Sequence, residues 1–156
     1  MVEPTGSGIG GDLFALIWSA EKDKLYGLNA SGKSPRSLKL EYFKDNGYEF
    51  IPPYGPLPVS VPGCVDGWFE MHEMFGRLPM RDILQPAINY ARNGFPVTEL
   101  IAFYLERNTQ RLAEYPNIKS VYMPGGKSPA KGEIFKNPLL ANTLEKIVKG
   151  GRNEFY

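Results

Sequence analysis

Leu13-Phe-Ala-Leu-Ile-Trp18 is the stretch of sequence that indicates how this chain folds. The polar residues Glu21–Lys24 follow it, and then comes Leu25-Tyr-Gly-Leu28. Two runs of β-prone residues around a short polar link predict an antiparallel hairpin. Because the first run is almost continuously apolar, we expect its strand to be covered on both faces, as in a layered protein with helices over a sheet.

Downstream, apolar residues at helical spacing predict an α+β chain with several amphipathic helices after the hairpin. Five prolines in residues 44–62 predict an extended connection before these helices. Pro86 should kink one helix or break it in two. No repeat or change of composition divides the chain, so residues 1–156 are expected to form a single segment without an internal boundary. The expected helices are 64–75, Met80–Arg92, Thr98–Glu114 and Pro138–Gly150.

The composition indicates a folded globular chain and excludes several classes of protein. Hydrophobic residues make up 42% of the 156 residues and charged residues 22%, which argues against disorder. The net charge is +1 with no basic stripe, so we expect no nucleic-acid partner. A single cysteine, Cys64, excludes an internal disulfide. No apolar run is long enough to span a membrane and none resembles a signal peptide, so the compartment is left open, with the cytoplasm favoured.

Two glycine-rich motifs invite a nucleotide-binding interpretation. Gly6–Gly11 satisfies G-x-G-x-x-G, but it precedes a strand, whereas a dinucleotide motif follows a strand and begins a helix. Gly27–Ser34 fits the phosphate-binding loop G-x-x-x-x-G-K-S at every position. Pro35 then opposes the helix that this loop requires, because a residue before proline avoids the helical region. A nucleotide binder is therefore a remote alternative.

His72-Glu73 suggests a zinc-binding helix, but the pattern H-E-x-x-H requires a second histidine where this chain has Gly76. His72 is the chain's sole histidine, so histidine-based catalytic triads are also excluded within this sequence. We expect no metal and no cofactor.

Several motifs, taken in order, resemble those of the γ-glutamyltransferase family. The opening is similar to V-E-P-x-x-S-G-I-G-G, and a later stretch is similar to P-G-x-V-x-G at the start of a helix. Each motif is weak alone, whereas their order and spacing are specific. The matching stretches are Val2–Gly11, Val61–Gly67, Phe75–Pro79, Gln85–Ile88, Arg92–Phe95, Gly132-Glu133 and Glu154–Tyr156.

This resemblance implies part of an N-terminal-nucleophile hydrolase fold, a four-layered αββα sandwich. Members of the family cut themselves into a large and a small subunit. The new N-terminal threonine of the small subunit attacks a γ-glutamyl amide, such as that of glutathione, with its own α-amine as the base. The acyl group then passes to water or to an amino acid. The implied partners are the rest of the large subunit, a threonine-led small subunit and a small-molecule acyl donor.

The sequence contains no cleavage motif of the T-T-H-x-S kind. The four threonines Thr5, Thr98, Thr109 and Thr143 stand in a glycine turn, at a helix start and in two helix interiors. We therefore expect an internal segment of a large subunit, with an internal Met1 and no catalytic residue of its own. Such a segment alone should be inactive.

A loop after the second strand bears on the substrate. Family members carry D/N-x-R-E-x-A-P there, and the arginine clamps the α-carboxylate of the glutamyl group. Without gaps, Ser31 takes the place of the arginine and Gly32 that of the glutamate, with the cations Lys33 and Arg36 nearby. We expect these four residues to line the substrate pocket; the alternative is a solvated turn. Relatives with S-G-x-x-P include acylases, so an acylase of other acyl amides and a non-catalytic binding protein stay open.

Overall fold

The computed structural model describes residues 2–6 and 8–156. These residues form two compact units. The hairpin unit comprises Gly8–Gly76, and the helical unit comprises residues 2–6 and Arg77–Tyr156. The expectation of a single segment without a boundary stays a prediction.

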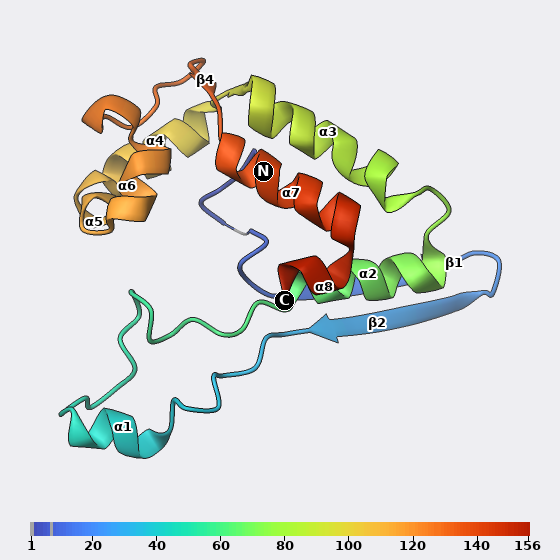
Figure 1. Ribbon diagram of the computed structural model, residues 1–156, viewed down its shortest axis with the longest axis horizontal. Coiled ribbons are helices and arrows are strands. Elements are labelled where there is room, and N and C mark those ends of the chain that lie inside the picture. Colours follow the sequence, from blue (N-terminus) through green and yellow to red (C-terminus); the bar gives the residue numbers. More distant parts are fainter. Residues whose placement is uncertain (1, 7) are drawn as a thin grey trace. The chain divides into compact units, whose positions relative to one another are not determined.

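The hairpin unit contains the predicted hairpin. Strand β1 (Leu13–Ser19) pairs antiparallel with β2 (Lys24–Ala30), so that Leu13 lies opposite Ala30 and Ser19 opposite Lys24. Helix α2 (Cys64–Phe75) lies along this hairpin (Figure 1). It ends at Gly76, as predicted.

Helix α2 covers one face of the hairpin. A β-carbon on Gly67 would lie 2.7 Å from side-chain atoms of both Leu13 and Ala30, so the missing side chain lets the helix approach the strands closely. The opposite face carries Phe14, Leu16 and Trp18, which are 67%, 79% and 59% exposed. Among the described residues a helix covers only one face of the first strand, so the expectation of a strand covered on both faces is wrong for this part of the protein.

A long connection joins β2 to α2. It contains the short helix α1 (Leu40–Asp45), which the sequence did not predict, and then runs from residue 46 to 63 without a helix or strand. The prolines of this stretch explain its extended course. Phe43 is the buried residue of α1, and its ring packs edge-on against Tyr42 and Tyr48.

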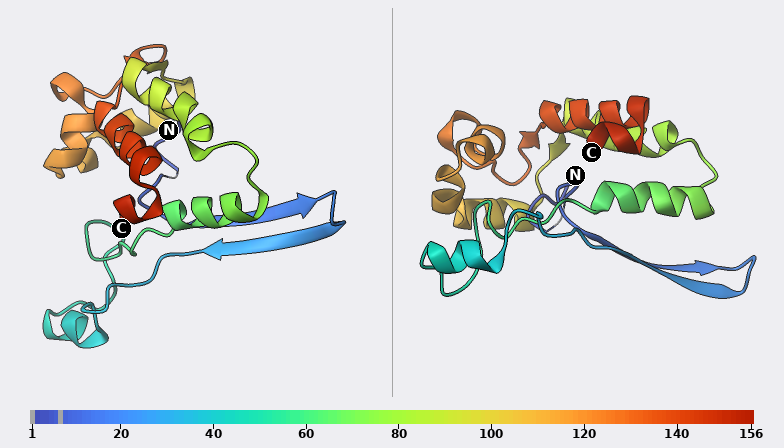
Figure 2. Two further views of the ribbon diagram at one scale, coloured as in Figure 1. Left: turned by 45° about the vertical axis from the view of Figure 1, so that its right-hand side comes forward. Right: turned by 60° about the horizontal axis from the view of Figure 1, so that its bottom comes forward.

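In the helical unit, α3 (Met80–Asn93) and α7 (Pro138–Gly150) lie side by side (Figure 2). Arg92 links them, because its guanidinium donates to Asn142 at 2.9 Å and to Glu145 at 2.7 Å. An apolar cluster of buried residues also lies in this unit: Phe95, Val97, Ile101, Leu105 and Phe135. The elements of this unit are α3 (Met80–Asn93), β3 (Phe95–Pro96), α4 (Glu99–Arg107), α5 (Thr109–Ala113), α6 (Pro116–Tyr122), a 3-10 turn (Pro124–Gly126), β4 (Ile134–Phe135), α7 (Pro138–Gly150) and α8 (Arg152–Phe155).

Two details of the helices differ from expectation. Helix α3 continues through the exposed Pro86 and is not broken in two there, and the alternative expectation, a kink, stays a prediction. The expected helix Thr98–Glu114 is interrupted at Asn108. There the Asn108 side chain donates to the Tyr104 carbonyl at 2.8 Å, and the Thr109 hydroxyl donates to the Glu106 carbonyl at 2.7 Å. Side-chain bonds of this kind compete with the helical pattern.

The expected caps are present in α7. Asn137 accepts a hydrogen bond from the Leu140 amide at 3.0 Å, and Gly151 ends the helix with a φ of 73°. Across residues 2–6 and 8–156, none of the helices has the length and apolar character needed to cross a membrane.

Candidate functional site

The predicted substrate loop begins where β2 ends, and Asp12 holds it there. Oδ1 of Asp12 accepts a hydrogen bond from the Gly32 amide at 2.7 Å. Oδ2 accepts from the Ser31 hydroxyl at 3.4 Å, and Asn29 accepts from the Ser31 amide at 2.9 Å. The residue before β1 therefore fixes the first two residues after β2.

A third segment joins this cluster from the connection before α2. The Ser60 hydroxyl donates to Oδ1 of Asp12 at 3.4 Å, and the Val61 amide donates to the Lys33 carbonyl at 2.9 Å. Gly32 has no room for a side chain, since a β-carbon there would lie 2.7 Å from the Ser60 hydroxyl and would overlap the Val61 carbonyl oxygen. The glycine permits this close approach of the two segments.

The start of α2 is tied to the same place. The amides of Gly63 and Cys64 donate to the Gly11 carbonyl at 3.1 and 3.0 Å. Gly11 in turn donates to the Gly8 carbonyl at 3.1 Å. The glycine-rich turn and the P-G-x-V-x-G motif, which lie about fifty residues apart, thus meet at one end of the hairpin.

The four predicted site residues fall into two pairs. Ser31 and Gly32 are held by Asp12, whereas the side chains of Lys33 and Arg36 are exposed and have no hydrogen-bond or ion-pair partner among the described residues. The role of all four in substrate binding stays a prediction. Sequence reasoning missed Asp12, because its bond to Gly32 spans 20 residues and no local motif reports it.

An apolar pocket of about 780 Å³ adjoins the loop. Its wall includes Ser34 of the loop and Ser60, with Lys44 and Glu49 as the charged lining residues. This volume lies in the range of small-molecule sites, and so does the combination of an apolar wall with a few polar groups. The apolar lining consists mainly of Pro35, Leu38, Phe43, Ile51, Leu57 and Val59.

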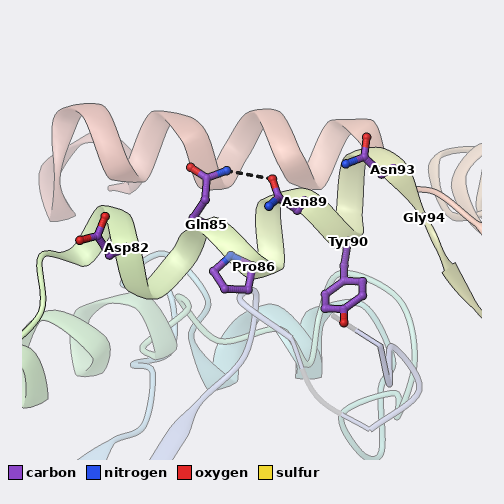
Figure 3. Close-up of a pocket in the computed structure, with 7 residues that line it drawn as sticks. All are labelled: Asp82, Gln85, Pro86, Asn89, Tyr90, Asn93 and Gly94. Atoms are coloured by element: carbon purple, nitrogen blue, oxygen red, sulfur yellow. Dashed lines mark hydrogen bonds between the residues drawn. The ribbon is translucent and has the colours of Figure 1, made fainter.

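A second, shallower pocket of about 590 Å³ follows one side of α3 (Figure 3). Polar side chains line it, and Gln85 donates to Asn89 at 2.9 Å, as the dashed line in Figure 3 marks. Asp82 and Tyr90 are its titratable residues. It includes none of the predicted site residues and no candidate nucleophile.

Three of the four threonines and the cysteine have structural positions. Thr98 caps α4, while the hydroxyl groups of Thr109 and Thr143 donate to backbone carbonyls one turn earlier. Cys64 is buried, and burial raises the pKa of its thiol, which keeps it protonated at neutral pH. Within the described ranges, no group of three His, Cys, Asp or Glu residues could hold a metal ion.

The geometry opposes both nucleotide alternatives. Gly27 lies inside β2 opposite Leu16, and the next helix starts only at Leu40, so no helix N-terminus follows Gly32-Lys33-Ser34. The glycines up to Gly11 precede β1 and likewise open no helix.

The motifs and this site lead to the family. The profile of the gamma-glutamyltranspeptidase family matches residues 1–156, and the chain belongs to this family. Over 157 residues the chain is 36% identical to the glutathione hydrolase-like YwrD proenzyme of Bacillus subtilis (strain 168), covering all of this chain and 30% of that protein.

Solved structures agree. The cephalosporin acylase of Bacillus halodurans superposes with a TM-score of 0.92 and 41% identity, over 99% of this chain and 30% of its own. The γ-glutamyltranspeptidase of Helicobacter pylori superposes with a TM-score of 0.91 and 28% identity, over 99% and 45%. The expected fold class, part of an N-terminal-nucleophile hydrolase, is confirmed. The chain spans less than half the length of these relatives.

Proposed function

We propose that this chain is part of an amide hydrolase or acyltransferase that acts on γ-glutamyl compounds such as glutathione. The observation that carries the proposal is the family match over the whole chain. In this role the segment supplies scaffold, through the hairpin and α2, and pocket wall, through Ser31, Gly32, Lys33 and Arg36.

The reaction requires a nucleophile from another part of the protein. A small-subunit N-terminal threonine attacks the acyl carbonyl carbon through Oγ, and its α-amine carries the hydroxyl proton to the departing amine as the amide C–N bond breaks. Water then attacks the resulting ester, the acid leaves, and the proton returns to the threonine. Thr98, Thr109 and Thr143 cannot take this part, because their hydroxyl groups serve the backbone.

The uncovered face of the hairpin supports a partner within the complete protein. Phe14, Leu16, Trp18 and Leu25 are all more than half exposed there, and Leu25 lies opposite Trp18. An apolar patch of this kind marks a surface that another element covers. We propose that a sheet of the threonine-led small subunit packs against this face.

Two experiments test the proposal. The complete, processed protein should release the aniline from a γ-glutamyl anilide, and replacement of the small-subunit threonine by alanine should abolish both processing and turnover. A processed, folded protein that hydrolyses no acyl amide would contradict the assignment and favour a non-catalytic binding protein. For the interface, Leu16→Glu should prevent assembly, whereas Glu21→Gln at the hairpin tip should not.

An acylase of other acyl amides is the second candidate. It is favoured by Ser31, which stands where the family's carboxylate-binding arginine is expected, and by the likeness to a cephalosporin acylase. At equal concentration, an acylase of this kind should hydrolyse an uncharged acyl anilide such as butyryl anilide faster than γ-glutamyl anilide, and a γ-glutamyl hydrolase should show the reverse order.

A further inference from the structure

Asp12 carries more than a structural role at the substrate loop. Its two oxygens accept three hydrogen bonds, from Gly32 at 2.7 Å and from Ser31 and Ser60 at 3.4 Å. These bonds come from segments 19 to 48 residues away along the chain. We infer that Asp12 is a specificity-determining residue. Its carboxylate accepts the hydrogen bonds that the Ser31 hydroxyl and the Gly32 amide could otherwise donate to a substrate. It therefore selects against substrates whose acyl group carries a carboxylate next to these two residues. The inference rests on the amide-hydrolase part of the proposed function and favours its second candidate, an acylase of other acyl amides, over a hydrolase of γ-glutamyl compounds.

The donors of the loop are the first step of the argument. A substrate carboxylate is recognised by N–H and O–H groups that point at it. At the place of the missing arginine, the loop offers the Ser31 hydroxyl and the Gly32 amide. Both donate to Asp12, so neither is left for a ligand unless the bond to Asp12 breaks.

The charge of Asp12 is the second step. Among the described residues, no lysine or arginine forms an ion pair with Asp12. Lys33 and Arg36 follow in the same loop, but their side chains do not reach it. The negative charge therefore acts on whatever lies against Ser31 and Gly32. Like charges at short range repel, and a second carboxylate is disfavoured there.

The adjoining pocket is the third step. Its lining is mostly apolar and contacts the loop through Ser34 and Pro35. An acyl chain that ends in a methyl group fits such a wall. A carboxylate buried there would lose its hydration, which costs free energy. The favoured donors are thus amides with an uncharged acyl chain.

Two anilides that differ in a terminal carboxylate test the inference in the complete, processed protein. Butyryl anilide lacks the terminal carboxylate that glutaryl anilide carries. The wild-type protein should hydrolyse the butyryl compound with the higher kcat/KM. Asp12→Ala frees both donors and removes the charge, so the ratio of glutaryl to butyryl kcat/KM should rise about three- to tenfold, mainly through a lower KM for glutaryl anilide. Asp12→Asn removes the charge but keeps one acceptor oxygen, and it should raise the ratio less.

Asp23→Asn is the matched control, because Asp23 lies in the turn at the other end of the hairpin, where asparagine tolerates the φ of 49°. It should leave the ratio unchanged. A binding readout independent of turnover is hydrogen exchange of the loop peptide: glutarate should slow it in Asp12→Ala and not in the wild type. A wild-type preference for glutaryl anilide, or an unchanged ratio in folded Asp12 variants, would overturn the inference and leave the amide hydrolase standing. Absence of turnover for every acyl anilide would instead remove the proposed function.

Discussion

The two ends of the hairpin differ in how their loops are held. At the tip, the turn between Ser19 and Lys24 has a local bond, from the Lys22 amide to the Ser19 hydroxyl at 3.3 Å. At the other end, Asp12 and Val61 hold the loop after β2 through bonds that span 19 or more residues. A loop fixed by distant segments keeps its shape only in the folded protein. Such a loop suits a pocket wall, whereas the tip suits a solvated turn.

The end of the hairpin whose loop is held by Asp12 and Val61 is called the tied end. The largest expected effect comes from adding a methyl group there. Gly32→Ala would force a β-carbon onto the Val61 carbonyl, which is backbone and cannot rotate away. We expect the free energy of unfolding to fall by about 1–3 kcal/mol and the loop amides to lose their protection from hydrogen exchange. Chemical denaturation and hydrogen exchange of the purified protein measure both.

Gly27→Ala is the control for this change. In β2 the new β-carbon would meet the Leu16 side chain at 3.8 Å, an ordinary contact, and alanine restricts the unfolded chain. Stability should change by no more than about 0.5 kcal/mol. Equal losses at Gly27 and Gly32 would show that the tied end is no more constrained than the strand.

Removal of the Asp12 charge should have the next largest effect. In Asp12→Asn the side chain retains one acceptor, but the bond from Gly32 loses its charged partner. Because Asp12 is exposed, we expect the loop to lose only about 1 kcal/mol of stabilisation, which makes hydrogen exchange of the Gly32 amide roughly fivefold faster. Exchange at the tip should not change. If exchange became equally faster at both ends of the hairpin, the substitution would have lowered the global stability of the protein and would say nothing of how the loop is held.

The elements that could be predicted from sequence have strong local signals. The hairpin follows from two apolar runs, and α7 follows from the cap at Asn137 and the glycine at its end. Helix α1 escaped prediction because it has six residues and buries only Phe43, too few for a periodic pattern. The break at Asn108 depends on side-chain bonds to the backbone, which apolar spacing does not report.

The candidate site was predictable only in part, for a related reason. Resemblance to a family motif located Ser31 and Gly32, because the motif is contiguous. Asp12 belongs to the site through a bond to a residue 20 positions away, and neither periodicity nor a local motif reports such a bond. The sequence therefore predicts which loop lines the substrate pocket, and the structure shows what holds this loop.

A smaller effect is expected from Ser60→Ala. The Ser60 hydroxyl contacts Oδ1 of Asp12 at 3.4 Å, a long bond beside the much shorter one from Gly32. Without this bond the loop should be about 0.5 kcal/mol less stable, and hydrogen exchange of its amides should be roughly twice as fast. Ser37→Ala, at an exposed position in the same connection, is the matched control and should leave the exchange of the loop unchanged.

The smallest effect belongs to the tip. Lys22→Ala removes an ammonium group 6.0 Å from the centre of the Tyr26 ring, while Lys24 stays at 5.1 Å and the backbone bond of the turn is kept. An exposed cation–π contact contributes about 0.5 kcal/mol at most, and Lys24 can replace it. Denaturation midpoint, loop exchange and turnover should all match the wild type. A change in turnover or in the exchange of the Gly32 amide would mean that the tip and the tied end are coupled along the strands, and the contrast between the two loops would then fail.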